Sequence, residues 1–214
     1  GGGIAGVAAA QAAVEAAPGA AVTLLSEESV LPYYRLNLTR LIAGDIVRDA
    51  LPLYPAEWYR EHRIALRTGT VVSRLDRAAR LVELNDGKTI PYDALVLATG
   101  SHPFLPPLPG NDRAGVVALR TAADAEALLR RIERDPRCMV IGGGVLGLET
   151  AAALGSRGAR VTLLESHPWL MPRQLNCVAA AILEAHLASL GVVVRKNART
   201  REIVGGEAVA GILL

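Results

Sequence analysis

Apolar and polar positions follow one another in blocks along the chain, and residues 137–165 give the clearest pattern. Cys138 to Ile141 is a short apolar run that predicts a strand, and it ends at a glycine-rich turn. An apolar helix is predicted from Val145 to about Ser156, followed by a second strand from Arg160 to Leu164. A strand, a tight turn, a helix and a second strand in this order are typical of a dinucleotide-binding unit.

The turn in this block fits the pattern G-x-G-x-x-G at Gly142, Gly144 and Gly147. The first glycine permits the tight turn, the second lets the backbone approach a pyrophosphate, and the third lets the helix pack closely on the sheet. Glu165 follows the second strand, 23 positions after Gly142, where a carboxylate can accept hydrogen bonds from a ribose diol. A merely structural turn would not need that carboxylate, so we predict a dinucleotide site.

The start of the chain repeats this pattern. Gly1, Gly3 and Gly6 have the same spacing, an alanine-rich helix runs to about Ala17, and a strand is predicted over residues 22–25. The residue that matches Glu165 is Ser26, so the next residue, Glu27, is the candidate for contacting a ribose. Two such units imply two cofactors, or one cofactor and a nucleotide substrate.

Both ends of the sequence predict an incomplete fold. No strand precedes the first glycine turn, although a unit of this type needs one. Short strands are predicted over Val192–Val194, Glu202–Val204 and Ala208–Leu214, as parts of an unfinished sheet. We therefore expect these residues to be the interior of a longer protein.

The segment between the two units predicts further short strands. Ile64–Leu66, Thr70–Leu75 and Leu81–Leu84, with a turn at residues 85–87, predict a small antiparallel meander. Tyr92–Ala98 is apolar enough for a buried strand of the main sheet. It ends in Thr99-Gly100, where a glycine allows close approach to a ligand.

Helices are predicted over Pro55–His62 and Asp124–Arg134, and the proline-rich segment Pro103–Gly110 is expected to cross between domains. The predicted fold class is α/β, with two Rossmann-like three-layer domains that carry small antiparallel β-meander insertions. We place a first domain at residues 1–112 and a second at residues 113–214, each of them incomplete.

Composition narrows the function. The net charge is +2 and basic residues are scattered, which argues against nucleic-acid binding. No apolar run approaches about 18 residues, which argues against a membrane span. The four histidines lack metal-ligand spacing, and we assign no metal. Cys138 and Cys177 form no C-x-x-C motif, so we expect buried thiols and a cytoplasmic location.

The order of motifs resembles a known family. Gly1 to Gly6, then Tyr92 to Gly100, then Gly142 to Gly147 are similar to the pyridine nucleotide-disulfide oxidoreductase superfamily over essentially the whole chain. The segments Pro32–Arg35, His102–Gly110 and Leu170–Asn176 most resemble NADH:rubredoxin or ferredoxin reductases and the FAD/NAD-binding part of NADH:nitrite reductases.

This resemblance implies FAD in the first domain and NADH in the second, with NADPH less favoured because no Arg stands directly beside Glu165. Arg160 and Arg173 leave that preference open. The residues implied to line FAD are Gly1, Gly3, Gly6, Glu27, Arg35, the backbone near Val72, Ala98, Thr99, Gly100 and Arg120. Those implied for the nicotinamide nucleotide are Gly142, Gly144, Val145, Leu146, Gly147 and Glu165.

Two further residues have implied catalytic roles. Glu149 matches the acid that this family keeps beside the flavin, and Arg40 stands where the family has a lysine. An arginine there remains positive and can stabilise the negative charge of a reduced flavin. Its planar guanidinium would be placed differently from the ammonium group of a lysine. A solvated surface arginine is the alternative.

The implied reaction passes a hydride from NADH to FAD and then electrons to an acceptor. Residues 37–40 contain no cysteine, which favours a separate electron acceptor: rubredoxin, ferredoxin or a fused sirohaem and iron-sulfur module. A Cys-free NADH oxidase and an NADH-responsive flavoprotein sensor that acts through a partner remain alternatives. The resemblance also implies an interface domain beyond residue 214, and a homodimer through it stays open.

Overall fold

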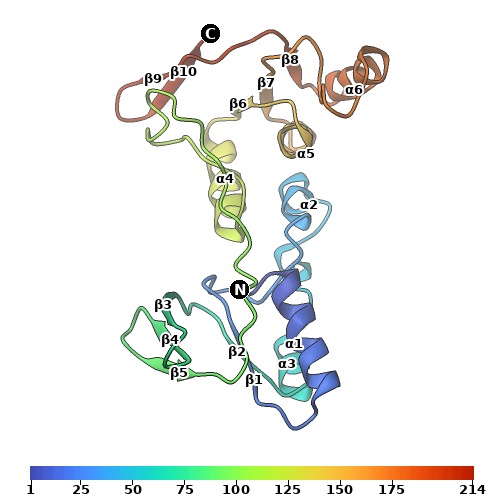
Figure 1. The fold of residues 1–214 in the computed structure, drawn as a ribbon. Helices are drawn as coiled ribbons and strands as arrows, with labels where there is room; N and C mark the ends of the chain where they lie inside the picture. Colours follow the sequence, from blue (N-terminus) through green and yellow to red (C-terminus); the bar gives the residue numbers. More distant parts are fainter. The chain divides into compact units, whose positions relative to one another are not determined.

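The computed structural model describes residues 1–214, which form two compact units (Figure 1). The first unit consists of residues 1–37 and 48–102, and the second of residues 38–47 and 103–214. The chain therefore enters the second unit briefly, returns to the first, and leaves it again at the start of the proline-rich segment. None of its helices combines the length and the apolar character that a membrane span requires.

The first unit is built on two parallel strands. The strand β1 (Val22–Leu25) pairs in parallel with β2 (Ile64–Arg67), and the helices α1 (Ile4–Ala16) and α3 (Ala56–Glu61) pack on this pair (Figure 1). Their shared core is apolar apart from one phenol and contains Val7, Ala10, Leu24, Tyr59 and Ile64. Burying such side chains stabilises the unit by about 1.5–3 kcal/mol for each large one.

The prediction for residues 64–66 was wrong, because β2 belongs to the parallel sheet and not to the meander. The meander consists instead of β3 (Val72–Asp76), β4 (Leu81–Leu84) and β5 (Thr89–Pro91), all antiparallel. The apolar sequence of β2 suits either sheet. Its parallel register against β1 pairs Ile64 with Val22 and buries Ile64 in the same core as Leu24, which the meander would not do.

The predicted buried strand at Tyr92–Ala98 was also wrong. These residues form no strand, and Val96 and Leu97 are exposed. The physical reason is that no strand of the first unit hydrogen-bonds to this segment, and an extended apolar run without a paired neighbour is not a sheet strand. The backbone of Ala98 nevertheless lies close to Gly1.

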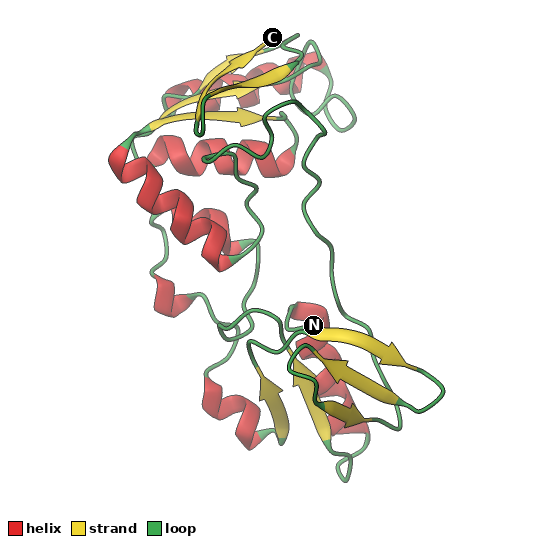
Figure 2. Cartoon of the chain, turned by 90° about the vertical axis from the view of Figure 1, so that its left-hand side faces the viewer, coloured by secondary structure: helices red, strands yellow, loops and turns green.

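The second unit contains a three-stranded parallel sheet in the order β6 (Arg137–Ile141), β7 (Arg160–Leu164), β8 (Val193–Arg195). The helix α5 (Val145–Ser156) packs on β6 and β7, and α6 (Cys177–Ser189) packs on β8. Figure 2 shows helices beside the strands of this unit. Both connections are crossovers between parallel strands, as a dinucleotide-binding unit requires. The predicted bounds of α5 and of the strand at 160–164 are confirmed.

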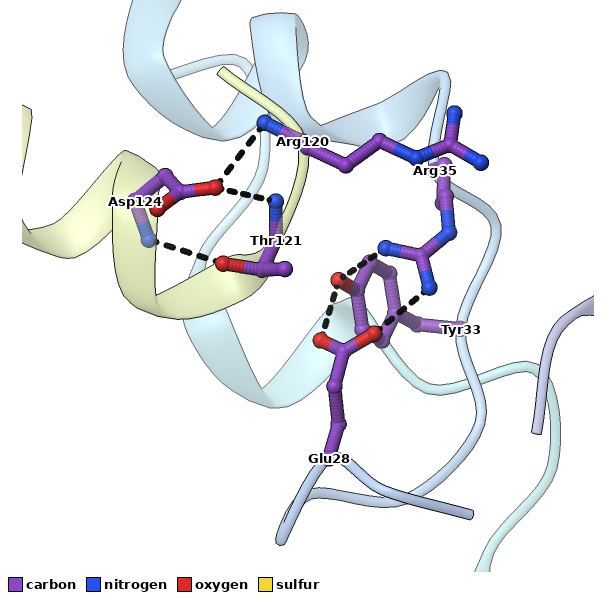
Figure 3. A network of polar contacts seen from close by, with 6 residues as sticks. All are labelled: Glu28, Tyr33, Arg35, Arg120, Thr121 and Asp124. Atoms are coloured by element: carbon purple, nitrogen blue, oxygen red, sulfur yellow. Dashed lines mark hydrogen bonds and ion pairs between the residues drawn. The ribbon is translucent and has the colours of Figure 1, made fainter. Parts of the chain in front are cut away.

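The helix α4 (Ala122–Arg134) starts with a capping box. The Thr121 hydroxyl accepts from the Asp124 N–H at 3.1 Å, and the Asp124 carboxylate accepts from the Thr121 N–H at 2.7 Å (Figure 3). These reciprocal bonds satisfy N–H groups that a helix start otherwise leaves unpaired.

The remaining elements are two strands and one helix of the second unit and a short 3₁₀ turn of the first. The antiparallel pair β9 (Glu202–Gly205) and β10 (Val209–Leu213) is joined to the segment before α4 by Arg113, whose Nε donates to the Ile203 carbonyl at 3.0 Å. The helix α2 (Asn37–Ala43) lies mostly in the second unit, and a short 3₁₀ turn, η1 (Arg48–Ala50), lies in the first.

The fold class is thus confirmed as α/β with parallel sheets and small antiparallel sheets. Complete three-layer domains are not observed, because the parallel sheets have two and three strands. The two cysteines differ from the expected pair of buried thiols. Cys138 is half-buried in β6, and Cys177 is exposed at the start of α6.

Candidate functional site: two glycine turns

The glycine turn of the second unit connects β6 to α5, and its three pattern glycines differ in what surrounds them. Gly142 has a φ of +109°, which residues with a side chain rarely adopt. A Cβ on Gly147 would overlap the carbonyl oxygen of Gly142, whereas a Cβ on Gly144 would meet no atom within 4 Å. The protein's own packing therefore requires the first and third glycines but not the second.

The first unit repeats this geometry. A Cβ on Gly6 would overlap the carbonyl oxygen of Gly1, and a Cβ on Gly3 would meet nothing within 4 Å. Gly1 is additionally confined by the carbonyl of Ala98. In both turns the middle glycine faces open space, which is where the pattern places a pyrophosphate.

Both helices that follow the turns begin without a side-chain cap. The N-cap residues Gly3 and Gly144 have nearly the same backbone conformation, with φ of −81° and −84° and ψ of −179° and 175°. The first N–H groups of a helix have no partner within the helix and carry its positive dipole end. Beyond Gly144, Val145 and Leu146 are exposed. An anion such as a pyrophosphate fits both helix starts.

Glu165 follows the end of β7, and its buried carboxylate makes four hydrogen bonds. Oε2 accepts from the Gly143 N–H at 2.8 Å. Oε1 accepts from the backbone N–H of His167 at 2.8 Å and from the Ser166 hydroxyl at 3.2 Å, and it lies 2.8 Å from Nδ1 of His167. The carboxylate thus links the glycine turn to the loop after β7. Its contact with His167 was not predicted.

These contacts determine the ionisation of Glu165. Burial alone would raise the pKa of its carboxyl group, but the hydrogen bonds from the backbone and ring of His167, from the Gly143 N–H and from the Ser166 hydroxyl together lower the pKa below its ordinary value. Glu165 is therefore a carboxylate at neutral pH, with only hydrogen-bond acceptors to offer a ligand.

Ser26 takes the corresponding position in the first unit. A Cβ on Gly2 would overlap the Ser26 hydroxyl, just as a Cβ on Gly143 would crowd Glu165. Ser26 is buried, and Glu27 beside it is exposed. The match of Ser26 to Glu165 in the sequence is thus reproduced in space, and Glu27 has an accessible carboxylate next to it.

Glu28, the next residue, lies in a polar network (Figure 3). The Tyr33 hydroxyl donates to Oε2 of Glu28 at 2.6 Å, and Arg35 donates to Oε1 at 2.6 Å and to the Tyr33 hydroxyl at 3.1 Å. Tyr33 is buried. Arg35 was predicted to line FAD. The structure adds that Glu28 and Tyr33 hold its guanidinium, although nothing in the sequence beyond their proximity indicated this.

The other residues implied for FAD lie in different parts of the chain. Ala98 and Thr99 lie beside Gly1, Gly100 has a φ of +72°, and Val72 begins β3. Arg120 belongs to the second unit, where its N–H donates to the Asp124 carboxylate at 3.0 Å (Figure 3).

Arg40 and Glu149, the two predicted catalytic residues, lie on helices of the second unit. Arg40 is on α2 and Glu149 is exposed on α5. Arg157, at the C-terminal end of α5, donates from Nε to the Ile42 carbonyl of α2 at 2.7 Å. This bond places the two helices next to each other, as Figure 1 shows.

The second unit contains a strand-turn-helix motif, and the first unit contains a glycine turn and helix with matching glycine packing. Together with their uncapped helix starts, these define a protein of the dinucleotide-binding α/β class. The chain belongs to the pyridine nucleotide-disulphide oxidoreductase family, whose model matches residues 1–213. This is a family of NAD(P)H-dependent FAD oxidoreductases, and the family that the sequence resembled is confirmed.

Two curated relatives and one solved structure illustrate the similarity. The chain is 36% identical over 191 residues to the NAD(P)H nitrite reductase of Bacillus subtilis (strain 168), covering 89% of the chain and 24% of that protein. It is 35% identical over 185 residues to the rubredoxin-NAD(+) reductase of Pseudomonas putida, covering 86% and 48%. The ferredoxin reductase for the CYP199A2 system of Rhodopseudomonas palustris superposes with a TM-score of 0.90 at 28% identity, covering 99% of this chain and 53% of that one. The chain thus spans a quarter to a half of the length of these proteins.

Proposed function

We propose that this chain is the FAD- and NADH-binding part of an oxidoreductase that passes electrons to a separate redox centre. In this proposal residues 1–112 form the FAD-binding domain and residues 113–214 the NADH-binding domain. The acceptor is a rubredoxin, a ferredoxin, or a fused sirohaem and iron-sulfur module of the nitrite reductase type.

The observation that carries the proposal is the duplicated glycine turn. Gly6 and Gly147 are required by the protein's own packing, whereas Gly3 and Gly144 face open space in front of uncapped helix starts. A structural turn has no reason to keep its middle residue small in two places. A ligand pyrophosphate at each turn supplies that reason.

The residues around Glu165 fit a nicotinamide nucleotide. Its carboxylate can accept from a ribose diol, and the N–H groups of Val145 and Leu146 can donate to the pyrophosphate. An ionised carboxylate repels a 2′-phosphate, which favours NADH over NADPH. When both cofactors are bound, the chemistry they supply is transfer of a hydride from the nicotinamide to FAD and onward transfer of electrons.

The residues of the first unit fit FAD. Gly3 leaves room for its pyrophosphate, and Glu27 presents an exposed carboxylate beside the position that corresponds to Glu165. Arg35 is held by Glu28, so its positive charge is largely balanced. Arg35 would therefore contribute to FAD binding mainly by donating hydrogen bonds in a fixed direction, and less through its net charge.

Arg40 and Glu149 are proposed to act beside the flavin. A guanidinium there would stabilise negative charge on the reduced ring, and a carboxylate would orient that guanidinium. The α2–α5 contact through Arg157 supports the pairing of the two helices that carry them.

The choice of a separate electron acceptor rests on the cysteines. The two cysteines lie in β6 and at the start of α6, and α2 contains none. Burial raises the pKa of the Cys138 thiol, which keeps that sulfur unreactive. The names of the rubredoxin and nitrite reductases among the relatives agree with an acceptor outside this chain.

The test is a visible spectrum of the full-length protein, recorded anaerobically before and after adding NADH and then NADPH. Flavin bands at about 450 nm that bleach faster with NADH support the proposal. A colourless protein that takes up no added FAD would refute it. Fast turnover with oxygen alone would indicate an oxidase, and a long-lived reduced complex with little turnover would indicate a sensor.

A further inference from the structure

Gly143, inside the glycine turn of the second unit, has both of its backbone polar groups bound by the loop after β7. Its N–H donates to Oε2 of Glu165 at 2.8 Å, and its carbonyl oxygen accepts from the N–H of Met171 at 3.1 Å. The side chain of Leu170 is fully buried, and a Cβ on Gly143 would overlap the Cδ2 atom of this leucine. The loop therefore holds Gly143 by two hydrogen bonds and by close packing.

The hydrogen bond from Met171 also fixes the direction of the next amide group. The Gly143 carbonyl and the Gly144 N–H belong to one planar peptide unit, and in a trans peptide these two groups point in opposite directions. Because the carbonyl is directed at Met171, the Gly144 N–H is directed away from it. This N–H makes no hydrogen bond within the chain, and a Cβ on Gly144 would meet no atom within 4 Å. The Gly144 N–H is therefore free to donate to a ligand.

Met171 makes this contact in a backbone conformation that few residues adopt. Its φ is +52°, in the left-handed region where β-branched residues are rarest and asparagine is enriched. The loop also closes on Met171 from its other side, since the N–H groups of Gln174 and Leu175 both donate to the Met171 carbonyl at 2.9 Å. Strained residues that their surroundings hold in place are common in ligand clamps.

We propose that Met171 is a positioning residue for the diphosphate of the bound nucleotide. Its backbone N–H holds the peptide before Gly144 in the orientation that lets the Gly144 N–H donate to a diphosphate oxygen. A hydrogen bond to a charged oxygen is stronger than one between neutral groups, so its direction matters for affinity. Met171 acts through its backbone and does not itself contact the nucleotide. The inference rests on the proposed nucleotide site and adds to it one donor and the residue that orients this donor.

The test compares two substitutions that both remove the Met171 side chain. Valine is strongly disfavoured at positive φ, so Met171→Val should withdraw the N–H from Gly143, whereas asparagine tolerates this conformation and Met171→Asn should keep the bond. NMR titrations of the full-length protein give Kd values for NAD⁺ and for adenosine, which has no phosphate. We expect Met171→Val to raise the Kd for NAD⁺ at least about fivefold and to change the Kd for adenosine by less than about twofold. Met171→Asn should bind both ligands as the unmodified protein does.

Arg80→Val is the matched control for backbone strain. Arg80 has a φ of +53° and is exposed in the turn between β3 and β4, in the first unit. Valine at this position should lower the free energy of unfolding and leave the Kd for NAD⁺ unchanged. A loss of NAD⁺ affinity equal to that of Met171→Val would attribute the effect to strain in general and overturn the inference.

A second measurement needs no substitution. In the unmodified protein with isotope-labelled glycine, NAD⁺ should shift the Gly144 amide resonance, and an unchanged resonance on saturation with NAD⁺ would overturn the inference. So would unchanged NAD⁺ affinity in Met171→Val, equal losses for NAD⁺ and adenosine, or equal losses in Met171→Val and Met171→Asn. Each of these results leaves the nucleotide site in place, because NAD⁺ still binds to the unmodified protein. Failure of the unmodified protein to bind NAD⁺ would overturn the proposed function and this inference with it.

Discussion

The amide nitrogen of Gly143 lies 2.8 Å from Oε2 of Glu165, and the two residues are separated by 22 positions in the chain. This buried bond joins the turn before α5 to the loop after β7. A carboxylate proposed to contact a ribose is therefore also part of the structure that shapes the pyrophosphate turn. Substitutions at Glu165 should consequently change stability as well as nucleotide binding.

Glu165→Gln should destabilise the protein by about 1–3 kcal/mol. A glutamine oxygen can still accept from Gly143, but its amide group then faces the N–H of His167, and this part-buried donor loses its acceptor. Urea unfolding measures the loss. Glu207→Gln, at an exposed position, is the matched control and should leave stability within about 0.5 kcal/mol. Equal stability of both variants would show that the contacts of the Glu165 carboxylate contribute little.

The same carboxylate predicts a pH dependence. The pKa of Glu165 is lowered in the folded protein, so its contribution to stability is fully present above its unfolded pKa, near 4.5, and is lost as the pH falls through the lower folded value. The difference in unfolding free energy between the unmodified protein and Glu165→Gln should therefore shrink as the pH falls below about 4.5. Urea titrations at several acidic pH values measure this difference, and a constant difference would contradict the assignment.

The glycine turn offers a test that separates folding from binding. Gly147→Ala should destabilise the protein strongly, because the new Cβ would overlap the Gly142 carbonyl. Gly144→Ala has open space and an ordinary φ, so stability should change by no more than about 1 kcal/mol while NAD⁺ affinity decreases at least about tenfold. Thermal unfolding and calorimetry distinguish the two effects. An unchanged NAD⁺ affinity in a folded Gly144→Ala variant would remove the turn from the nucleotide site.

Adjacent acids in the first unit allow a similar comparison. Glu28→Gln weakens the hydrogen bonds to Tyr33 and Arg35 and should cost about 1–2 kcal/mol of stability. Glu27→Gln should leave stability nearly unchanged and lower FAD affinity, because Glu27 is exposed beside Ser26. Chemical denaturation and FAD fluorescence titration measure both quantities. Unchanged FAD affinity in a folded Glu27→Gln variant would remove the Glu27 carboxylate from the FAD site.

The sequence predicted the elements whose limits are set locally. The apolar run of α5 is bounded by Gly144 before it and by Gly158 after it, so its range Val145–Ser156 could be read from spacing. Strand partners could not be read in this way. Ile64–Arg67 is short and apolar, and only its long-range pairing with β1 decides that it belongs to the parallel sheet.

The candidate site was likewise predicted only where it depends on local sequence patterns. Glycine spacing and the carboxylate after β7 are local patterns, and they located the turn and Glu165. The contacts of His167 with Glu165, and of Glu28 with Tyr33 and Arg35, depend on how loops turn back after a strand ends. No periodicity in the sequence encodes these turns.

Arg157 tests whether the α2–α5 contact matters for the proposed chemistry. Its Nε donates to the Ile42 carbonyl near the C-terminal end of α2, where a positive charge also interacts favourably with the helix dipole. Arg157→Gln should therefore loosen α2 and increase hydrogen exchange of its amides. The exposed Arg134→Gln at the end of α4 is the control and should leave α2 protected.

The consequence for the flavin follows from what α2 carries. If Arg40 must stay close to α5 to stabilise a reduced flavin, Arg157→Gln should slow flavin reduction by NADH at least about threefold while the Kd for NADH stays the same. Stopped-flow absorbance measures both quantities in one titration. Faster exchange in α2 with an unchanged reduction rate would mean that Arg40 acts independently of the contact, or takes no part in the reaction. A weaker Kd with an unchanged limiting rate would instead assign Arg157 to nucleotide binding.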